Sequence, residues 1–117
     1  MYQFSAKHKR LSAEQIWSSI HNGLSKEVTI KSIRSKISYN VNYVTEEAIS
    51  FSAATRNKEA PETIMKNDFT KVVSLLLKEK EFNTSSSSEL FKGTKIYKKR
   101  SPLFALLLSS SVIETVE

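Results

Sequence analysis

Residues 33–53 read IRSKISYNVNYVTEEAISFSA, and their hydrophobic residues recur with a period of two. This period is typical of a strand with one buried face. A polar break at 45–47 separates a first alternating run, 33–44, from a second one. The stretch therefore predicts an antiparallel hairpin. The side chains expected in the core are Ile33, Ile37, Tyr39, Val41, Tyr43, Ile49, Phe51 and Ala53.

A helix is predicted ahead of this hairpin, over 12–22. Ser12 and Gln15 have the spacing of a capping box, in which each side chain accepts a hydrogen bond from the other's backbone N–H. Hydrophobic residues then recur at helical spacing. Gly23 is expected to end the helix as a left-handed C-cap.

Two further helices are predicted after the hairpin. Asn67 suits an N-cap, and the i, i+3, i+4 spacing of the apolar residues behind it predicts a helix over 67–81. Ser101 followed by Pro102 has the order of an N-cap and a first helical residue. The last helix is therefore expected over 102–111, and it is apolar on nearly every side.

The elements together predict an α+β fold in a single domain spanning 1–117. Its expected layout is an N-terminal helix, an antiparallel hairpin or small three-stranded sheet, and two main C-terminal helices. Residues 28–31 are expected to form either a third strand or a helical turn, and 63–65 a short edge strand. A chain of 117 residues, 39% hydrophobic and 26% charged, has ordinary globular composition.

Composition also limits the compartment and the chemistry. The absence of cysteine excludes disulfides, thiolate metal sites and thiol nucleophiles. The longest purely apolar run, 103–108, is much shorter than the roughly 20 residues that a membrane-spanning helix needs. The N-terminus lacks the charged-then-apolar order of a secretory signal. We therefore expect a cytoplasmic protein without membrane contact.

Few residues in the chain suit catalysis. Histidine occurs only as His8 and His21, and aspartate only as Asp68. A zinc site needs three or four ligands brought together, and a hydrolytic triad needs a base and an orienting group. We therefore expect no enzyme, no catalytic residue, no metal and no cofactor. The alternative from this class is a small metal-independent nuclease or toxin that uses one of the two histidines with nearby lysines.

The feature that points most directly to a partner is the segment KGTKIYKKR, residues 92–100, in a chain of net charge +6. Its cations surround an aromatic residue and end at the expected N-terminus of the last helix, where free N–H groups favour an anion. Lysine side chains there could contact phosphates, and the aromatic ring could stack on a base. The alternative is a solvated loop. The predicted nucleic-acid site comprises Lys92, Lys95, Tyr97, Lys98, Lys99, Arg100 and Ser101, extended by Arg34 and Lys36.

The functional hypothesis is a non-enzymatic module that binds nucleic acid, such as DNA, through phosphate contacts. The alternative is a small protein-binding regulator, an inhibitor or adaptor of a larger nucleic-acid machine, whose surface engages an acidic protein. In that hypothesis the hairpin edge or the apolar last helix makes the contact. The same helix predicts a homodimer, unless it is simply the central helix of the core.

Overall fold

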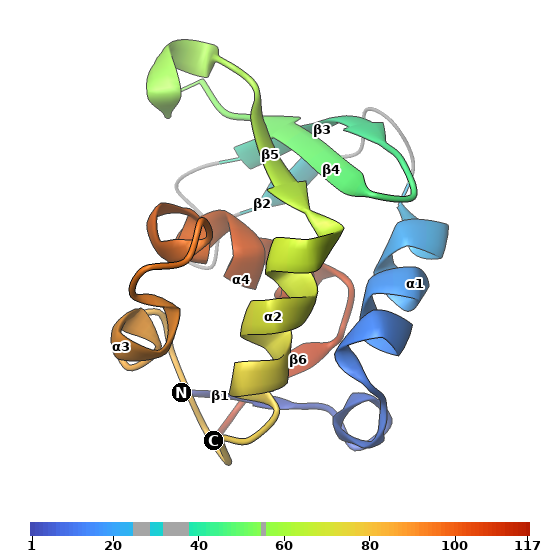
Figure 1. The fold of residues 1–117 in the computed structure, drawn as a ribbon, viewed down its shortest axis with the longest axis vertical. Coiled ribbons are helices and arrows are strands. Elements are labelled where there is room, and N and C mark those ends of the chain that lie inside the picture. The colour runs from blue at the N-terminus through green and yellow to red at the C-terminus, as the bar shows by residue number, and fades with distance from the viewer. Residues whose placement is uncertain (25–28, 32–37, 55) are drawn as a thin grey trace.

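The computed structural model describes residues 1–24, 29–31, 38–54 and 56–117 (Figure 1). The architecture is α+β, as predicted, with short 3₁₀ helices labelled η. The strands are β1 (Tyr2–Phe4), β2 (Thr29–Lys31), β3 (Ser38–Val44), β4 (Ala48–Ser52), β5 (Glu62–Met65) and β6 (Ile113–Thr115). The helices are η1 (His8–Arg10), α1 (Ala13–Gly23), η2 (Asn57–Glu59), α2 (Lys66–Leu76), α3 (Ser88–Phe91), η3 (Tyr97–Lys99) and α4 (Arg100–Ser109).

The main sheet has the strand order β2-β3-β4-β5 and is antiparallel throughout. The predicted hairpin is confirmed as β3 and β4, and both short flanking strands that the sequence suggested are present. Helices α1, α2 and α4 all lie on one side of this sheet (Figure 1). Residues 33–37 of the predicted first strand lie outside the described residues.

The expected face of β3 is correct for two residues and wrong for a third. Tyr39 and Val41 are buried, whereas Tyr43 is 43% exposed. The pairing register between β3 and β4 shifts between Val41 and Tyr43. An extra residue in one strand reverses the inward and outward alternation beyond it. This irregularity explains why a strict period of two failed there.

Helix α1 begins as predicted and ends differently. The Gln15 N–H donates to Ser12 Oγ at 3.2 Å and the Ser12 N–H to Gln15 Oε1 at 2.9 Å, so the capping box is complete. Gly23, however, is the last helical residue and no left-handed C-cap. The chain leaves the helix in extended conformation at Leu24, and a turn of that kind needs no positive φ.

The starts of the two later helices also differ from the prediction. α2 begins at Lys66 with Met65 in the N-cap position, so Asn67 lies inside the helix. α4 begins at Arg100, and its N-cap position is Lys99. Ser101 is therefore not the N-cap, because η3 runs directly into α4 and helical geometry starts before the serine is reached.

Helix α4 is the central helix of the core. All six residues from Pro102 to Leu107 are buried. The described core forms one cluster of buried side chains that reaches from Phe4 to Ile113. An apolar helix covered in this way within its own chain offers no face to a partner, so the argument for a dimer from this helix loses its basis.

The chain ends add a small second sheet that the sequence analysis missed. β1 and β6 pair antiparallel, and the Tyr2 N–H donates to the Phe82 carbonyl oxygen at 2.7 Å. Phe82 packs edge-on against Phe104 of α4, with ring centroids 5.8 Å apart. The two ends therefore close the core on the side opposite the main sheet (Figure 1).

Candidate nucleic-acid interface

The basic segment 92–100 is built from tight turns between buried anchors. Phe91 and Ile96 are 0% and 1% exposed, so they hold the segment against the core. Gly93 takes the left-handed φ of 82° that turns the chain out of α3. The hydrogen bonds that follow, from the Thr94 N–H to the Phe91 oxygen and from the Tyr97 N–H to the Thr94 oxygen, span three residues.

The turns with three-residue spacing decide which cations face solvent. Side chains three residues apart lie on the same side of such turns. Lys95 and Lys98 are accordingly both exposed, whereas Ile96 and Lys99 both point toward the core and sheet. Lys92, within the first turn, is also exposed. The segment therefore separates its cations into an outward and an inward set.

The inward set is engaged within the protein. The Lys99 ammonium donates to the Thr63 carbonyl oxygen on β5 at 2.7 Å. The Arg100 guanidinium carbon lies 4.4 Å from the centroid of the Tyr97 ring, a cation–π contact. One Arg100 nitrogen, Nη1, is buried without a hydrogen-bond partner. Lys99 therefore holds the segment on the β5 edge, whereas the contact of Arg100 lies within the segment itself.

Arg56 is the residue that sequence reasoning missed. Its Nε lies 2.6 Å from Glu62 Oε2, and its Nη2 donates to the Lys98 carbonyl oxygen at 2.7 Å. Arg56 thereby ties η3 to the loop ahead of β5. An arginine six residues before a glutamate in a polar loop carries no motif. The contact with Lys98 joins positions 42 residues apart, so no local signal could have revealed it.

The outward set is available to a ligand. The ammonium groups of Lys92, Lys95 and Lys98 have no hydrogen-bond or ion-pair partner among the described residues. Arg56 with Glu62 forms the sole ion pair in that part of the chain. Tyr97 is 36% exposed, with one ring face against Arg100. Unpaired lysines on a backbone that is held in place can neutralise phosphates without breaking hydrogen bonds or ion pairs within the protein.

The remaining predicted site residues do not join this surface in the described structure. Arg34 and Lys36 lie outside the described residues. Ser101 is exposed within the first turn of α4, and the structure gives its hydroxyl no capping bond. The described interface is therefore smaller than the predicted one and lies along the β5 edge.

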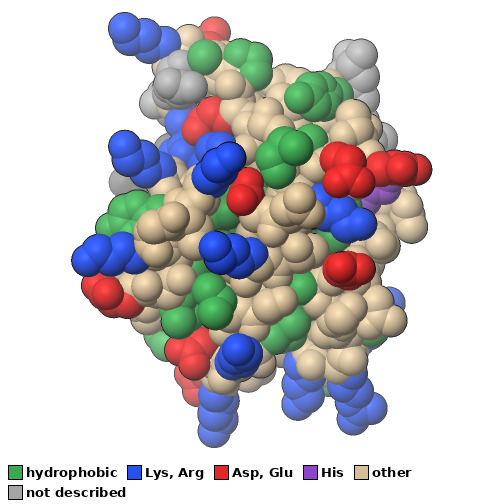
Figure 2. Space-filling model, viewed as in Figure 1, with side chains coloured by type: hydrophobic (Ala, Val, Ile, Leu, Met, Phe, Trp, Pro, Cys, Tyr) green, Lys and Arg blue, Asp and Glu red, His purple; other side chains and the backbone are tan. Residues whose placement is uncertain are grey.

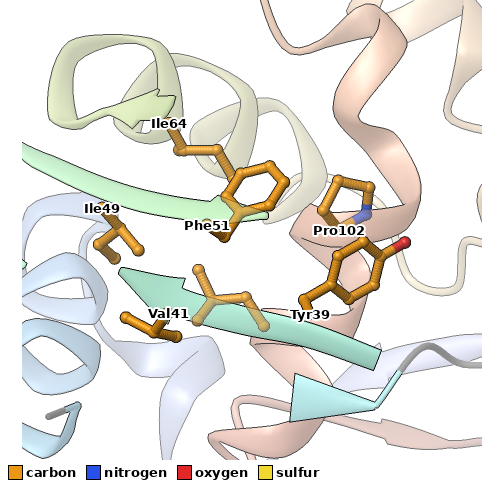
Figure 3. Close-up of a pocket in the computed structure, with 7 residues that line it drawn as sticks. Tyr39, Val41, Ile49, Phe51, Ile64 and Pro102 are labelled. Carbon is orange, nitrogen blue, oxygen red and sulfur yellow. The ribbon is translucent and has the colours of Figure 1, made fainter. Parts of the chain in front are cut away.

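A small cavity between the sheet and α4 offers no binding site. It measures about 10 Å³ and is lined by apolar side chains of Tyr39, Phe51 and Pro102, among others (Figure 3). The Tyr39 hydroxyl is buried and has no hydrogen-bond partner. Burial raises the pKa of Tyr39; the positive charge of Arg56 lowers it and the negative charge of Glu62 raises it further. The hydroxyl therefore stays protonated at neutral pH.

His8 lies in η1 ahead of α1, and His21 lies in the last turn of α1, a helix of 11 residues that is about 16 Å long. His8 is buried, with Nδ1 2.6 Å from Ser5 Oγ, and burial, followed by the charge of Lys7, lowers its pKa. His21 lines a cleft of about 260 Å³ together with Glu46, Glu47 and Lys66. The described residues contain no group of three metal-ligating side chains. The structure does not bring the two histidines into one site.

Within the described residues, none of the helices has the length and apolar character needed to cross a membrane. Comparisons with protein-family models, with curated proteins and with solved structures found no match to this chain, so no residue role is carried over from another protein.

Proposed function

We propose that the chain binds nucleic acid through phosphate contacts from the outward lysines Lys92, Lys95 and Lys98. The observation that carries the proposal is their shared state: all are exposed and unpaired, on a backbone that buried side chains and Arg56 hold in place. Because the backbone is already held in place, binding restricts the lysine side chains but requires little ordering of the backbone. Each phosphate that a lysine neutralises releases condensed counterions, which drives association.

The surroundings of Tyr97 favour a duplex over a single strand. Base stacking needs an accessible ring face, and Arg100 already covers one face of Tyr97. Phosphate contacts need no such face. We therefore expect a mode of binding dominated by the backbone of the nucleic acid, with little dependence on its sequence.

The protein-partner alternative receives less support from the surface. Among the described residues, the large hydrophobic side chains that are exposed are Met1, Tyr43, Met65 and Tyr97. A protein interface usually has an apolar core of aromatic and aliphatic side chains. The apolar helix α4 is buried, and both edges of the β3–β4 hairpin are paired, with β2 on one side and β5 on the other. Neither element that this hypothesis used is open for contact.

The test measures duplex binding as a function of salt. Fluorescence anisotropy with a duplex of about 20 base pairs should show log affinity falling with log salt. The variant Lys92→Ala/Lys95→Ala/Lys98→Ala should lose about 0.9 units of slope per contact, up to about 2.7 in all. Its free energy of unfolding should change by about 0.5 kcal/mol or less per site, because no side-chain contact is removed.

The matched control replaces the same three lysines by arginine and so keeps the charge. It should retain the slope of the parent, since counterion release depends on charge and not on the identity of the cation. If the alanine variant folds and binds with the parent's affinity and slope, these lysines are not the site. If the parent binds neither duplex nor single strand at low salt, the proposed function is wrong.

A further inference from the structure

Two exposed lysines, Lys71 on α2 and Lys78 just after it, are called here the α2 row. Phe69, Val72, Val73 and Leu76 are buried on the inner face. Asn67, Lys71 and Ser74 are exposed on the other side, at spacings of four and three residues, and the exposed Lys78 follows two residues after the helix ends. α2 runs from the sheet toward the opposite end of the molecule (Figure 1).

A groove of about 330 Å³ lies beyond the end of this row. Lys9 of η1 and Lys80, four residues after α2, line it from opposite segments of the chain. The buried Phe4 also lines the groove, as do Gln3 and Glu114, whose side chains are joined by a hydrogen bond from Gln3 Nε2 to Glu114 Oε2 at 3.2 Å. Lys9 and Lys80 are exposed, and neither has an ion-pair partner within the described residues.

The outward lysines and the groove are connected by α2. Helix α3, which leads into the basic segment, packs against α2. Figure 2 shows Lys and Arg side chains over the middle, the left margin and the lower edge of this view, with some acidic side chains among them. The densest acidic group lies at the right, beside a histidine. The charge of this face is therefore uneven.

We infer that the α2 row and the Lys9–Lys80 groove continue the phosphate-binding surface, so that one duplex lies along α2 from the outward lysines to the groove. The inference rests on the proposed function and adds to it the length and course of the bound duplex. The protein's longest extent is 34 Å. At 3.4 Å per base pair this corresponds to a footprint of about 10 base pairs.

The acidic residues next to Lys78 and Lys80 allow the predicted path of the duplex to be tested. Glu79 and Glu81 are exposed and alternate with Lys78 and Lys80. A duplex along this path passes close to their carboxylates. The phosphates and the carboxylates are both negative, so they repel each other at such short range. The variant Glu79→Gln/Glu81→Gln therefore binds a long duplex several-fold more tightly at low salt than the parent. Unchanged or weaker binding contradicts the path.

The main experiment compares duplexes of about 6 and about 20 base pairs, shorter and longer than the footprint. The variant Lys9→Ala/Lys80→Ala should lose up to about 1.8 units of salt slope with the long duplex and almost none with the short one bound at the outward lysines. The control Lys9→Arg/Lys80→Arg should keep the parent's slope on both. Circular dichroism and a denaturant titration establish that each variant is folded.

The outcomes separate this inference from the proposed function. If alanine at the outward lysines weakens binding while alanine at the groove leaves the long-duplex slope intact, the inference is wrong and the function stands. If the groove variant loses equal slope on both duplexes, the groove is an independent anion site and the continuous path is wrong. If the parent binds no nucleic acid, the proposed function itself fails.

Discussion

Lys95 and Lys98 differ from Lys99 and Arg100 in environment, although all four belong to one segment of six residues. The first pair is exposed and unpaired, whereas the second is engaged with the Thr63 carbonyl and the Tyr97 ring. The three-residue turns of the segment set this division, because positions three residues apart, such as Lys95 and Lys98, lie on the same side. A basic run in a sequence therefore mixes cations that stabilise the fold with cations that can bind a ligand.

The largest expected effect comes from replacing Phe91, the buried residue that holds both sets of cations against the core. Phe91 is fully buried just ahead of the first outward lysine. Phe91→Ala should lower the free energy of unfolding by about 3–5 kcal/mol, because it removes a large buried ring and leaves a cavity. A urea titration measures this change, with Leu90→Ala, at a partly buried neighbour, as the milder comparison. A loss below about 1 kcal/mol would mean that the segment is not held by this ring.

A smaller effect should separate the two sets directly. Lys99→Ala removes a charged donor from the Thr63 carbonyl and should cost about 1 kcal/mol, whereas Lys98→Ala should cost about 0.5 kcal/mol or less. Lys99→Met keeps the alkyl stem without the ammonium and should cost nearly as much as alanine if the hydrogen bond matters. Denaturant titrations of the three variants measure the differences. Equal costs at positions 98 and 99 would erase the distinction between the sets.

The smallest effect concerns His8, a basic side chain that is buried. Because burial lowers the pKa of His8 below its unfolded value of 6.5, folding favours the neutral imidazole. This contribution to stability is complete above the unfolded pKa and declines as the pH falls from there through the folded pKa.

Unfolding free energies at about pH 7.5 and about pH 5.5 measure this decline. The difference between the two pH values should be smaller in His8→Gln, which has no imidazole to protonate. An identical difference in the parent and the variant would show that His8 does not contribute. The overall stability of the variant does not enter the comparison, because only the pH difference is compared.

Much of the secondary structure followed from local patterns. The Ser12 and Gln15 capping box, the β3–β4 hairpin and the buried face of α2 were all predicted and are present. The errors occurred where tertiary context overrides such patterns, as at the register shift before Tyr43 and the early start of α4 ahead of Ser101. Neither position carries a sequence signal, since both depend on how strands pair and how η3 leads into the helix.

The candidate site was predicted only as a composition. The segment 92–100 was identified from its charge, but the sequence analysis assigned its cations one common role. Their division into outward and inward sets needed the turn spacing and the position of Thr63. Arg56 and the Lys9–Lys80 groove could not be predicted, because each combines residues that are distant in the chain.

Local sequence sets what depends on neighbouring residues: the caps, the periodicity of helix and strand, the apolar character of α4 and the basic character of the segment that leads into it. Tertiary structure decides what depends on distant residues: the pairing of β1 with β6, the complete burial of α4 and the lysines that remain unpaired. The physical reason is that charge and hydrophobicity are properties of a side chain, whereas burial and pairing are properties of its surroundings in the fold.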